Sequence, residues 1–238
     1  MLRTLFDLLS MLPAGGRRKV TRWMLDRIWS HFTTTQVIGR ENVPQGPCLF
    51  ICNHLSNADG VTLYRALRPK VVFFLAGVKL QDTVMTRVVA NAMDTIPIRP
   101  GSPDVEALKR AVETLRHGQS VLIFPEGTRS RTGALLRAKK GAALIARRAG
   151  VPIVPVALTG TEKFLPINDA DMGGENVSRA AVTVRFGRPF TVADLAVVTA
   201  EGDDDRQALA DAMMRRVAEL LPAEYQGEYR VHATASSL

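Results

Sequence analysis

Cysteine is scarce in this sequence, which contains only Cys48 and Cys52 among 238 residues. The two lie four positions apart in an apolar run that reads as a strand, where a rise of about 3.3 Å per residue separates their Cα atoms by about 13 Å. A disulfide between them is excluded, because bridged Cα atoms lie within about 7 Å of each other. The sequence also has no cysteine and histidine spacing typical of zinc sites, so no metal is predicted.

Long apolar runs are missing as well. No stretch of about 18 uncharged apolar residues occurs, so no transmembrane helix is expected. The first twelve residues lack a long apolar core and contain Asp7, which makes them a poor secretory signal. Any association with a membrane is therefore expected at its surface.

Acidic residues are fewer than basic ones, with 23 Asp and Glu against 31 Lys and Arg, for a net charge of +8. Such an excess suggests an anionic partner, which could be nucleic acid, a membrane surface or a phosphorylated substrate. The basic residues follow no recognised nucleic-acid-binding motif, so nucleic acid is not an expected partner. Apolar residues make up 46% of the chain and charged residues 23%, which excludes a disordered chain.

The pattern along the chain predicts three regions. Residues 1–35 read as an N-terminal amphipathic helical segment, residues 36–222 as one large domain, and residues 223–238 as a polar tail. One domain with short appendages is what a chain of this length is expected to form.

The N-terminal segment has two helical stretches. Leu2–Leu12 carries apolar residues at helical spacing, Pro13–Gly16 breaks the pattern, and a second stretch interleaves basic residues with Trp23 and Trp29. Basic residues and tryptophans together are typical of helices that lie in a membrane interface. A membrane-associating helical hairpin is one interpretation, and a hairpin packed on the main core is the other.

Beyond residue 35, short apolar segments alternate with helical patterns. The expected strands are Gln36–Ile38, Cys48–Cys52, Val71–Ala76, Thr95–Ile98, Val121–Phe124, Ile153–Leu158 and Ala181–Phe186. The expected helices are Asp59–Leu67, Thr83–Met93, Pro103–Arg116, Lys140–Ala149 and Asp205–Leu220. The alternation predicts an α/β fold with a central, mostly parallel sheet flanked by helices. Ligands bind such sheets beyond the carboxyl ends of the strands, and polar clusters follow Cys52, Ile98 and Phe124.

The first polar cluster contains His54 and Asp59, five residues apart. Neither a regular helix nor a strand brings residues at this spacing together, so the chain must turn between them. Ser56 and Asn57 favour such a turn before a helix. Asp59 could then hold one imidazole nitrogen and leave the other as a general base. Alternatively, Ser56 and Asp59 form a capping box and His54 is a hydrogen-bonded loop residue.

The second cluster runs from Phe124 to Ser130 with the sequence FPEGTRS. Gly127 permits a close backbone approach, Thr128 offers a hydroxyl, and Arg129 offers a planar fork suited to phosphate. A charged surface turn, with Glu126 paired to a nearby arginine, is the alternative. The compact set of anion-binding groups favours a phosphate site.

Two further segments complete the pattern. The expected strand Thr95–Ile98 ends in Arg99, which is a second candidate for phosphate binding or an ion-pair partner of Glu126. The apolar segment Val151–Leu158 carries no catalytic groups, and fits either a wall for a fatty chain or a core strand.

Together these segments resemble the lysophospholipid acyltransferases of the glycerolphosphate acyltransferase superfamily, typified by 1-acylglycerol-3-phosphate acyltransferases. That family carries an Asn-His-x4-Asp block, matched by Asn53, His54 and Asp59, and a second block ending in arginine, matched by Arg99. Its FPEGTRS block is matched at every position, and its apolar, proline-containing block is matched by Val151–Val156. The blocks occur in the expected order within about residues 36–190.

The resemblance implies transfer of a fatty acyl group from acyl-CoA or acyl carrier protein to the hydroxyl of a lysophospholipid, with 1-acyl-sn-glycerol-3-phosphate as the favoured acceptor and phosphatidic acid as product. His54 would be the general base and Asp59 its partner, and no cofactor or metal is implied. The implied phosphate-binding residues are Arg99, Glu126, Gly127, Thr128 and Arg129. Another lysolipid acceptor, such as lysophosphatidylethanolamine or a lyso-ornithine lipid, and a non-catalytic module that binds anionic lipid are the alternatives. The expected location is the cytoplasmic face of a membrane, peripheral or monotopic, on an anionic surface.

Overall fold

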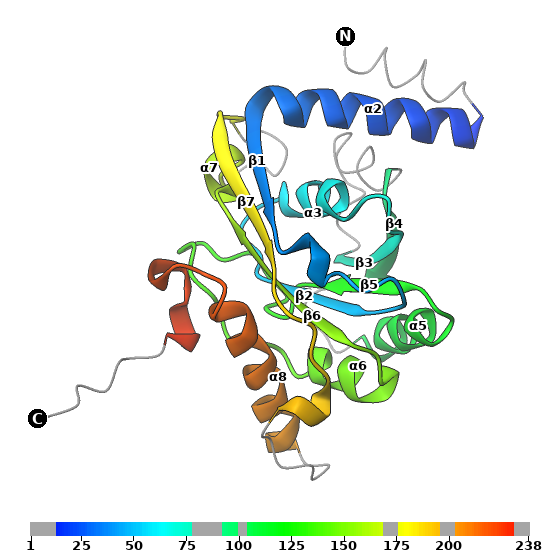
Figure 1. Cartoon of the computed structure of the whole chain (residues 1–238), viewed down its shortest axis with the longest axis vertical. Helices are drawn as coiled ribbons and strands as arrows, with labels where there is room; N and C mark the ends of the chain where they lie inside the picture. Colours follow the sequence, from blue (N-terminus) through cyan, green and yellow to red (C-terminus); the bar gives the residue numbers. More distant parts are fainter. Residues whose placement is uncertain (1–12, 78–91, 100–103, 169–175, 196–202, 231–238) are drawn as a thin grey trace, which may run out of the picture.

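A computed structural model describes residues 13–77, 92–99, 104–168, 176–195 and 203–230 (Figure 1). Their central feature is a seven-stranded sheet in the order β1-β7-β6-β2-β5-β3-β4. The strands are β1 Thr33–Ile38, β2 Leu49–Cys52, β3 Val72–Gly77, β4 Asp94–Ile98, β5 Ser120–Ile123, β6 Ile153–Thr159 and β7 Ala180–Phe186. The one antiparallel pairing is between β6 and β7, and all other neighbours are parallel. The predicted α/β fold with a mostly parallel sheet is confirmed.

Helices cover both faces of this sheet. They are α2 Ala14–Phe32, α3 Asp59–Leu67, α5 Val105–Arg116, α6 Gly141–Ala149, α7 Thr161–Phe164 and α8 Asp203–Ala218. Figure 1 shows α2 and α3 on one side of the sheet, with α5, α6 and α8 on the other. The sequence anticipated the bounds of α3 and missed the short helix α7, and the expected helix Thr83–Met93 lies almost entirely outside the described residues.

Alternation along β2 explains why two layers of helices are needed. Leu49 and Ile51 pack in the core cluster that contains α5, α6 and α8. Phe50 and Cys52 pack in the opposite cluster, with α2 and α3. Successive side chains of a strand point to opposite faces, so a strand that is apolar at every position must be covered on both sides. Both cysteines are buried and free, in agreement with the prediction from their spacing.

The second stretch of the predicted hairpin is the 19-residue helix α2, and its first stretch lies outside the described residues. The inner face of α2 belongs to the core: Leu25 and Trp29 are 2% and 6% exposed. The Trp29 indole N–H donates to Thr62 Oγ1 of α3 at 3.1 Å. The helix continues directly into β1, so the division expected at residue 35 falls within that strand.

Residues 223–230, from the region expected to be a polar tail, form two 3-10 turns, η4 Ala223–Tyr225 and η5 Gly227–Tyr229. These turns pack against residues 135–138: the Leu135 N–H donates to the Tyr225 carbonyl at 2.8 Å, and the Ala138 N–H donates to the Tyr229 hydroxyl at 2.8 Å. We call residues 223–230 the C-terminal clasp. It fixes the chain that follows the FPEGTRS segment. Two more 3-10 turns, η1 Arg40–Asn42 and η3 Val192–Asp194, occur in loops.

Candidate active site

The five parallel strands β6, β2, β5, β3 and β4 end at one edge of the sheet, where the predicted site residues follow them. β2 and β5 are direct neighbours, so the segments that contain His54 and Glu126 meet there. β4 is separated from β5 by β3, which puts Arg99 about 10 Å further along the edge at ordinary strand spacing.

His54 and Asp59 form a hydrogen-bonded pair. The His54 Nδ1 lies 2.7 Å from Asp59 Oδ2, with side chains that are 21% and 0% exposed. A carboxylate only accepts hydrogen bonds, so it holds the ring as the tautomer protonated on Nδ1. The other nitrogen, Nε2, is then the basic atom of the ring. The predicted pairing across a turn is therefore confirmed.

The turn itself is held by the same carboxylate oxygen. Asp59 Oδ2 also accepts the N–H groups of Leu55 at 2.6 Å and Ser56 at 2.9 Å. Asp59 is the first residue of α3, where a negative charge is favoured by the helix dipole. Only one half of the alternative capping box forms: Asp59 accepts the Ser56 N–H, whereas the Ser56 hydroxyl accepts the Ala58 N–H and not that of Asp59. Asp59 thus stabilises the helix start and orients the histidine.

Contacts with β6 and with Phe124 hold Asn53 and His54 in place. Asn53 exchanges a pair of hydrogen bonds with the backbone of Leu158 in β6, each 2.8 Å long. The His54 ring stacks on Phe124, with centroids 4.1 Å apart and planes at 15°. Asn53 belongs to the Asn-His-x4-Asp block, but the sequence analysis assigned it no role. In the structure it ties the end of β2 to β6. An amide side chain directly after a buried strand is the sequence feature that could have indicated this role.

The FPEGTRS segment forms hydrogen bonds with both backbone groups of His54, its N–H and its carbonyl. Glu126 Oε1 accepts the His54 N–H at 2.8 Å, and the Ser130 N–H donates to the His54 carbonyl at 2.8 Å. The second carboxylate oxygen of Glu126 accepts the N–H of Leu136 at 2.9 Å. Glu126 thus braces the histidine against the chain that the C-terminal clasp holds.

The position of Glu126 differs from that of a group on a phosphate-binding surface. It is 2% exposed, and burial raises the pKa of its carboxyl from 4.5 to about 7, against the opposing effect of the two backbone N–H donors. Its oxygens accept the backbone N–H groups of His54 and Leu136, and the predicted ion pair with Arg99 is absent, because Arg99 faces Asp104 instead. Its described contacts place it behind the histidine.

The next three residues of the segment are less enclosed than Glu126. Gly127 and Thr128 are exposed and Arg129 is half-buried. The Gly127 N–H donates to the Phe124 carbonyl at 3.0 Å, and Gly127 has a φ of +66°, a conformation that glycine adopts without the steric cost of a side chain. Gly127 and Thr128 therefore leave their backbone open to solvent in the segment that contacts the histidine.

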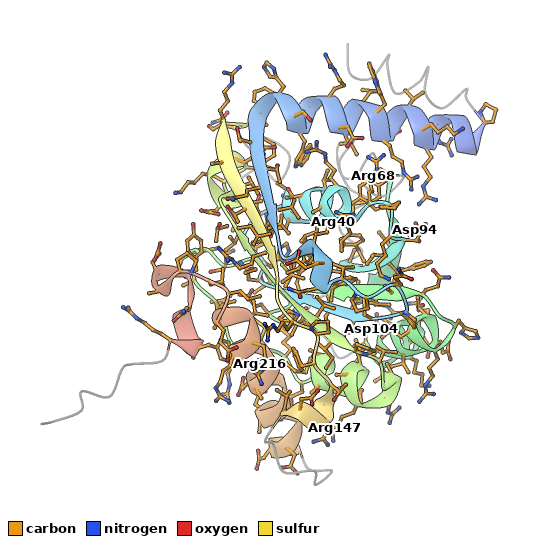
Figure 2. The ribbon with its side chains drawn as sticks, in the orientation of Figure 1. Arg40, Arg68, Asp94, Asp104, Arg147 and Arg216 are labelled. Atoms are coloured by element: carbon orange, nitrogen blue, oxygen red, sulfur yellow. The ribbon has the colours of Figure 1, made fainter. Side chains whose placement is uncertain are left out.

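Arg99 stands apart from this cluster. Its side chain is 79% exposed and lies 4.0 Å from Asp104, which is labelled in Figure 2 and caps the start of α5. The Arg99 N–H also donates to Asp104 at 3.0 Å. The pKa of Asp104 is lowered, chiefly by the backbone N–H groups of Arg99 and Ala107. The structure thus brings His54, Asp59 and the FPEGTRS segment together and leaves Arg99 at the rim.

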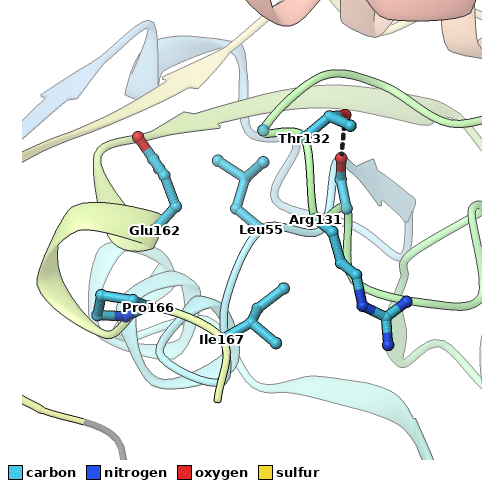
Figure 3. A pocket seen from close by; sticks show the side chains of 8 residues that line it. Leu55, Arg131, Thr132, Glu162, Pro166 and Ile167 are labelled. Atoms are coloured by element: carbon cyan, nitrogen blue, oxygen red, sulfur yellow. Dashed lines mark hydrogen bonds between the residues drawn. The ribbon is translucent and has the colours of Figure 1, made fainter. Parts of the chain in front are cut away.

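A cavity of about 400 Å³ adjoins the histidine segment (Figure 3). Its walls combine apolar and polar side chains, which are Leu55, Ser130, Arg131, Thr132, Gly133, Glu162, Pro166 and Ile167. Leu55 directly follows the histidine, and Ser130 binds its carbonyl, so the cavity opens next to the catalytic candidates. Within the described ranges, no three His, Cys, Asp or Glu side chains gather as they would around a metal ion.

Fold and site define an α/β protein that holds a histidine paired with a buried aspartate at the carboxyl edge of its sheet. The family model described as "Acyltransferase" matches residues 34–159, more than half of the chain and all four blocks up to β6. The chain therefore belongs to the acyltransferase family, which confirms the resemblance drawn from the sequence.

Curated relatives carry names of the same kind. A chloroplastic 1-acyl-sn-glycerol-3-phosphate acyltransferase of Brassica napus is 35% identical over 76% of this chain and 52% of its own length. The 1-acyl-sn-glycerol-3-phosphate acyltransferase of Bacillus subtilis is 26% identical over 78% of this chain and 87% of its own length. A lyso-ornithine lipid O-acyltransferase of Pseudomonas aeruginosa is 32% identical over 67% of this chain and 61% of its own length. The chain thus spans about half the length of the Brassica relative.

A solved structure supports the fold. The crystal structure of the 1-acyl-sn-glycerophosphate acyltransferase PlsC from Thermotoga maritima matches with a TM-score of 0.63 and 24% identity, covering 91% of this chain and 86% of that one. At that identity the likeness establishes a shared fold.

Proposed function

We propose that this protein transfers a fatty acyl group from acyl-CoA or acyl carrier protein to the free hydroxyl of a lysophospholipid, with 1-acyl-sn-glycerol-3-phosphate as acceptor and phosphatidic acid as product. The observation that carries the proposal is the 2.7 Å contact between His54 and a fully buried Asp59, next to the exposed Gly127 turn. Relatives named for this reaction support the choice of acceptor.

The reaction would use His54 as a general base. Nε2 takes the proton of the acceptor hydroxyl while its oxygen bonds to the thioester carbonyl carbon, and Asp59 stabilises the imidazolium that forms. When the carbon–sulfur bond breaks, the imidazolium returns the proton to the leaving thiolate. Such proton transfer accelerates a reaction about 10²–10⁴-fold. Holding the two substrates together would supply much of the remaining rate enhancement. This chemistry needs no cofactor beyond the thioester co-substrate.

The acceptor phosphate would bind at Gly127, Thr128 and Arg129, with Arg99 as a more distant cation. Arginine forms bidentate hydrogen bonds with phosphate, and the exposed Gly127 turn lets the ligand approach the backbone. Glu126 would serve the same site through its hold on His54, since a buried carboxylate beside a phosphate would repel it.

A membrane surface is proposed as the second partner, on the cytoplasmic side. The outer face of α2 exposes Trp23 at 64% and Ile28 at 37%, next to exposed Lys19 and Arg27. Two other basic residues of this helix, Arg18 and Arg22, turn inward. Arg18 pairs with Asp94 at 2.7 Å, and Arg22 donates to the Ala92 carbonyl at 3.1 Å. No helix among the described residues has the length and apolarity needed to span a bilayer.

A lyso-ornithine lipid is the second candidate acceptor, favoured by the Pseudomonas relative. The deciding experiment offers the purified protein 1-acyl-sn-glycerol-3-phosphate, lysophosphatidylethanolamine and a lyso-ornithine lipid, each with acyl-CoA and acyl carrier protein thioesters. Mass spectrometry reads the products, and His54→Ala is the control. Phosphatidic acid formed by the wild type alone supports the proposal. The absence of product from every lysolipid contradicts it.

The membrane surface is tested by co-sedimentation with vesicles that contain phosphatidylglycerol. Deleting residues 1–34 would remove Leu25 and Trp29 from the core, so substitutions on the outer face are preferable. Trp23→Ser should weaken binding, because an exposed tryptophan favours the interface. Val105→Ser, at a 56% exposed position on α5, is the matched control. Equal binding by both variants and the wild type would place the contact elsewhere.

A further inference from the structure

We propose that Lys139 is a further phosphate-binding residue, whose ammonium makes the Gly127 turn a site for phosphate monoesters. The inference rests on the proposed function and names the headgroup class of the acceptor. Lys139 lies outside the residues that the sequence pattern assigned to phosphate, in the link between the FPEGTRS segment and α6.

The position of the Lys139 side chain follows from the glycine. A Cβ atom built on Gly127 would lie 2.9 Å from Cδ, Cε and Nζ of Lys139 alike. The end of the lysine side chain therefore lies flat across the turn, in space that any other residue at position 127 would fill. Its ammonium is consequently adjacent to the exposed backbone of Gly127 and Thr128.

The backbone holds the lysine in this place. The Lys139 N–H donates to the Pro125 carbonyl at 2.8 Å, and the Lys139 carbonyl accepts the Ala142 N–H at 3.2 Å as α6 begins. The preceding residue, Ala138, is fixed by the Tyr229 hydroxyl of the C-terminal clasp and by the Gln207 side chain at 2.9 Å. The lysine is thus anchored at its Cα, and only its side chain has freedom to adapt to a ligand.

The charge of Lys139 is directed to a ligand. No carboxylate among the described residues forms an ion pair with Lys139, and the acid of the FPEGTRS segment, Glu126, binds two backbone N–H groups. The lysine is exposed, so an anion can reach it from solvent. Lys139 and Arg129 then supply two positive charges to one turn.

Two cations suit one class of headgroup. A phosphate monoester has a second pKa of about 6 and carries close to two negative charges at pH 7. The phosphodiester of lysophosphatidylethanolamine carries one, together with a positive amine. Lys139 should therefore favour a monoester acceptor, such as 1-acyl-sn-glycerol-3-phosphate, over zwitterionic lysolipids.

The first test compares Lys139→Gln with Lys109→Gln, which removes the same charge from an exposed ion pair on α5. A charge-assisted contact is worth about ten-fold or more in affinity. The KM for 1-acyl-sn-glycerol-3-phosphate should rise about ten-fold in Lys139→Gln, while the KM for the thioester changes less than about two-fold. Lys109→Gln should leave both unchanged. Equal rises for both substrates, or for both variants, would overturn the inference.

A second variant tests the contact itself. Gly127→Ala puts a methyl group where the lysine side chain lies, so it should displace the ammonium and weaken the acceptor to a similar degree. Because both changes remove one contact, the double variant Gly127→Ala/Lys139→Gln should be no weaker for the acceptor than Gly127→Ala alone. Independent, multiplying losses would show that Lys139 acts elsewhere.

A binding measurement separates this inference from the proposed reaction. Titration calorimetry with glycerol 3-phosphate needs no turnover and reports the phosphate subsite directly. The wild type and Lys109→Gln should bind it alike, and Lys139→Gln about ten-fold more weakly. Equal binding by all three proteins, or no binding by the wild type, would overturn the role of Lys139 whatever the enzyme acylates. Binding without turnover would refute only the proposed reaction.

Discussion

Two segments at the carboxyl edge of the sheet share one arrangement and differ in burial. After β2, His54 is followed five residues later by Asp59 at the start of α3, and after β4, Arg99 is followed five residues later by Asp104 at the start of α5. In each case the aspartate also accepts backbone N–H groups of its own segment. The first pair is 2.7 Å apart with the aspartate fully buried, and the second is 4.0 Å apart with the arginine 79% exposed.

The comparison shows that the spacing of the two residues alone does not fix the geometry of the pair. In both segments, an aspartate at a helix start lies close to a basic side chain five residues earlier, at the end of a strand. Among the described residues, the first segment is also enclosed, by Asn53, Phe124, Glu126 and Ser130, and this enclosure fixes its geometry. A fixed pair with a buried aspartate suits proton transfer, because the electrostatic interaction is stronger away from water. An exposed cation suits the capture of a charged ligand.

The largest effect is expected from breaking the enclosed pair. His54→Ala should lower kcat by about 10²–10⁴-fold, because general base catalysis is lost, and Asp59→Asn should come close to it, because an amide cannot stabilise the imidazolium. Steady-state kinetics measures the loss, and circular dichroism establishes that each variant is folded. Near-normal turnover by folded His54→Ala would remove His54 from the mechanism.

The enclosure itself can be tested through Glu126. Its pKa is raised from 4.5 to about 7, so the folded protein keeps a proton that the unfolded chain releases, and the free energy of unfolding falls as pH rises from about 4.5 through 7. Glu126→Gln cannot ionise, so the fall between pH 4.5 and pH 8 should be smaller by up to about 3 kcal/mol. Urea unfolding at the two pH values measures it. An identical fall in both proteins would mean that the carboxyl is ionised throughout this range.

A smaller effect is expected at the outward face of the FPEGTRS segment. Arg129→Ala should raise the KM for the lysophospholipid about ten- to a hundred-fold, the worth of one charge-assisted contact, and affect the thioester less. Kinetics with each substrate varied in turn measures the split. A matched loss for both substrates, or a loss of folding, would assign Arg129 a structural role.

The smallest effect is expected at the exposed pair. Arg99→Ala should raise the KM for the acceptor about two- to five-fold at low ionic strength, since exposed charges contribute about 0–1 kcal/mol. At 0.5 M salt the effect should vanish, because the Debye length falls to about 4–5 Å. Measuring KM at both salt concentrations checks it. A large, salt-independent loss would show that Arg99 closes onto the substrate.

The sheet and the histidine–aspartate pair could be predicted from the sequence because both depend on local pattern. Apolar runs bounded by polar clusters identified all seven strands, and turn-forming residues between His54 and Asp59 indicated their contact. The antiparallel direction of β7 could not be predicted, because pairing direction depends on the path of the connection as well as on the strand.

The role of Glu126 was hidden for a related reason. A glutamate between a strand and an arginine reads as a surface charge, and its bonds to the backbone of His54 and Leu136 arise only when β2 and β5 are neighbours. Lys139 was hidden likewise, because its contact depends on the left-handed conformation of Gly127.

The C-terminal clasp delays the completion of the site during synthesis, because it is made long after His54. Tyr229 fixes Ala138 and Tyr225 fixes Leu135, and the neighbouring Leu136 donates to the carboxylate that braces His54. Tyr229 follows His54 by roughly 175 residues, which at about 5–20 residues per second takes a ribosome roughly 10–35 s to add. In a nascent chain, the histidine and aspartate are therefore present for that long before the clasp can fix the chain that contacts Glu126.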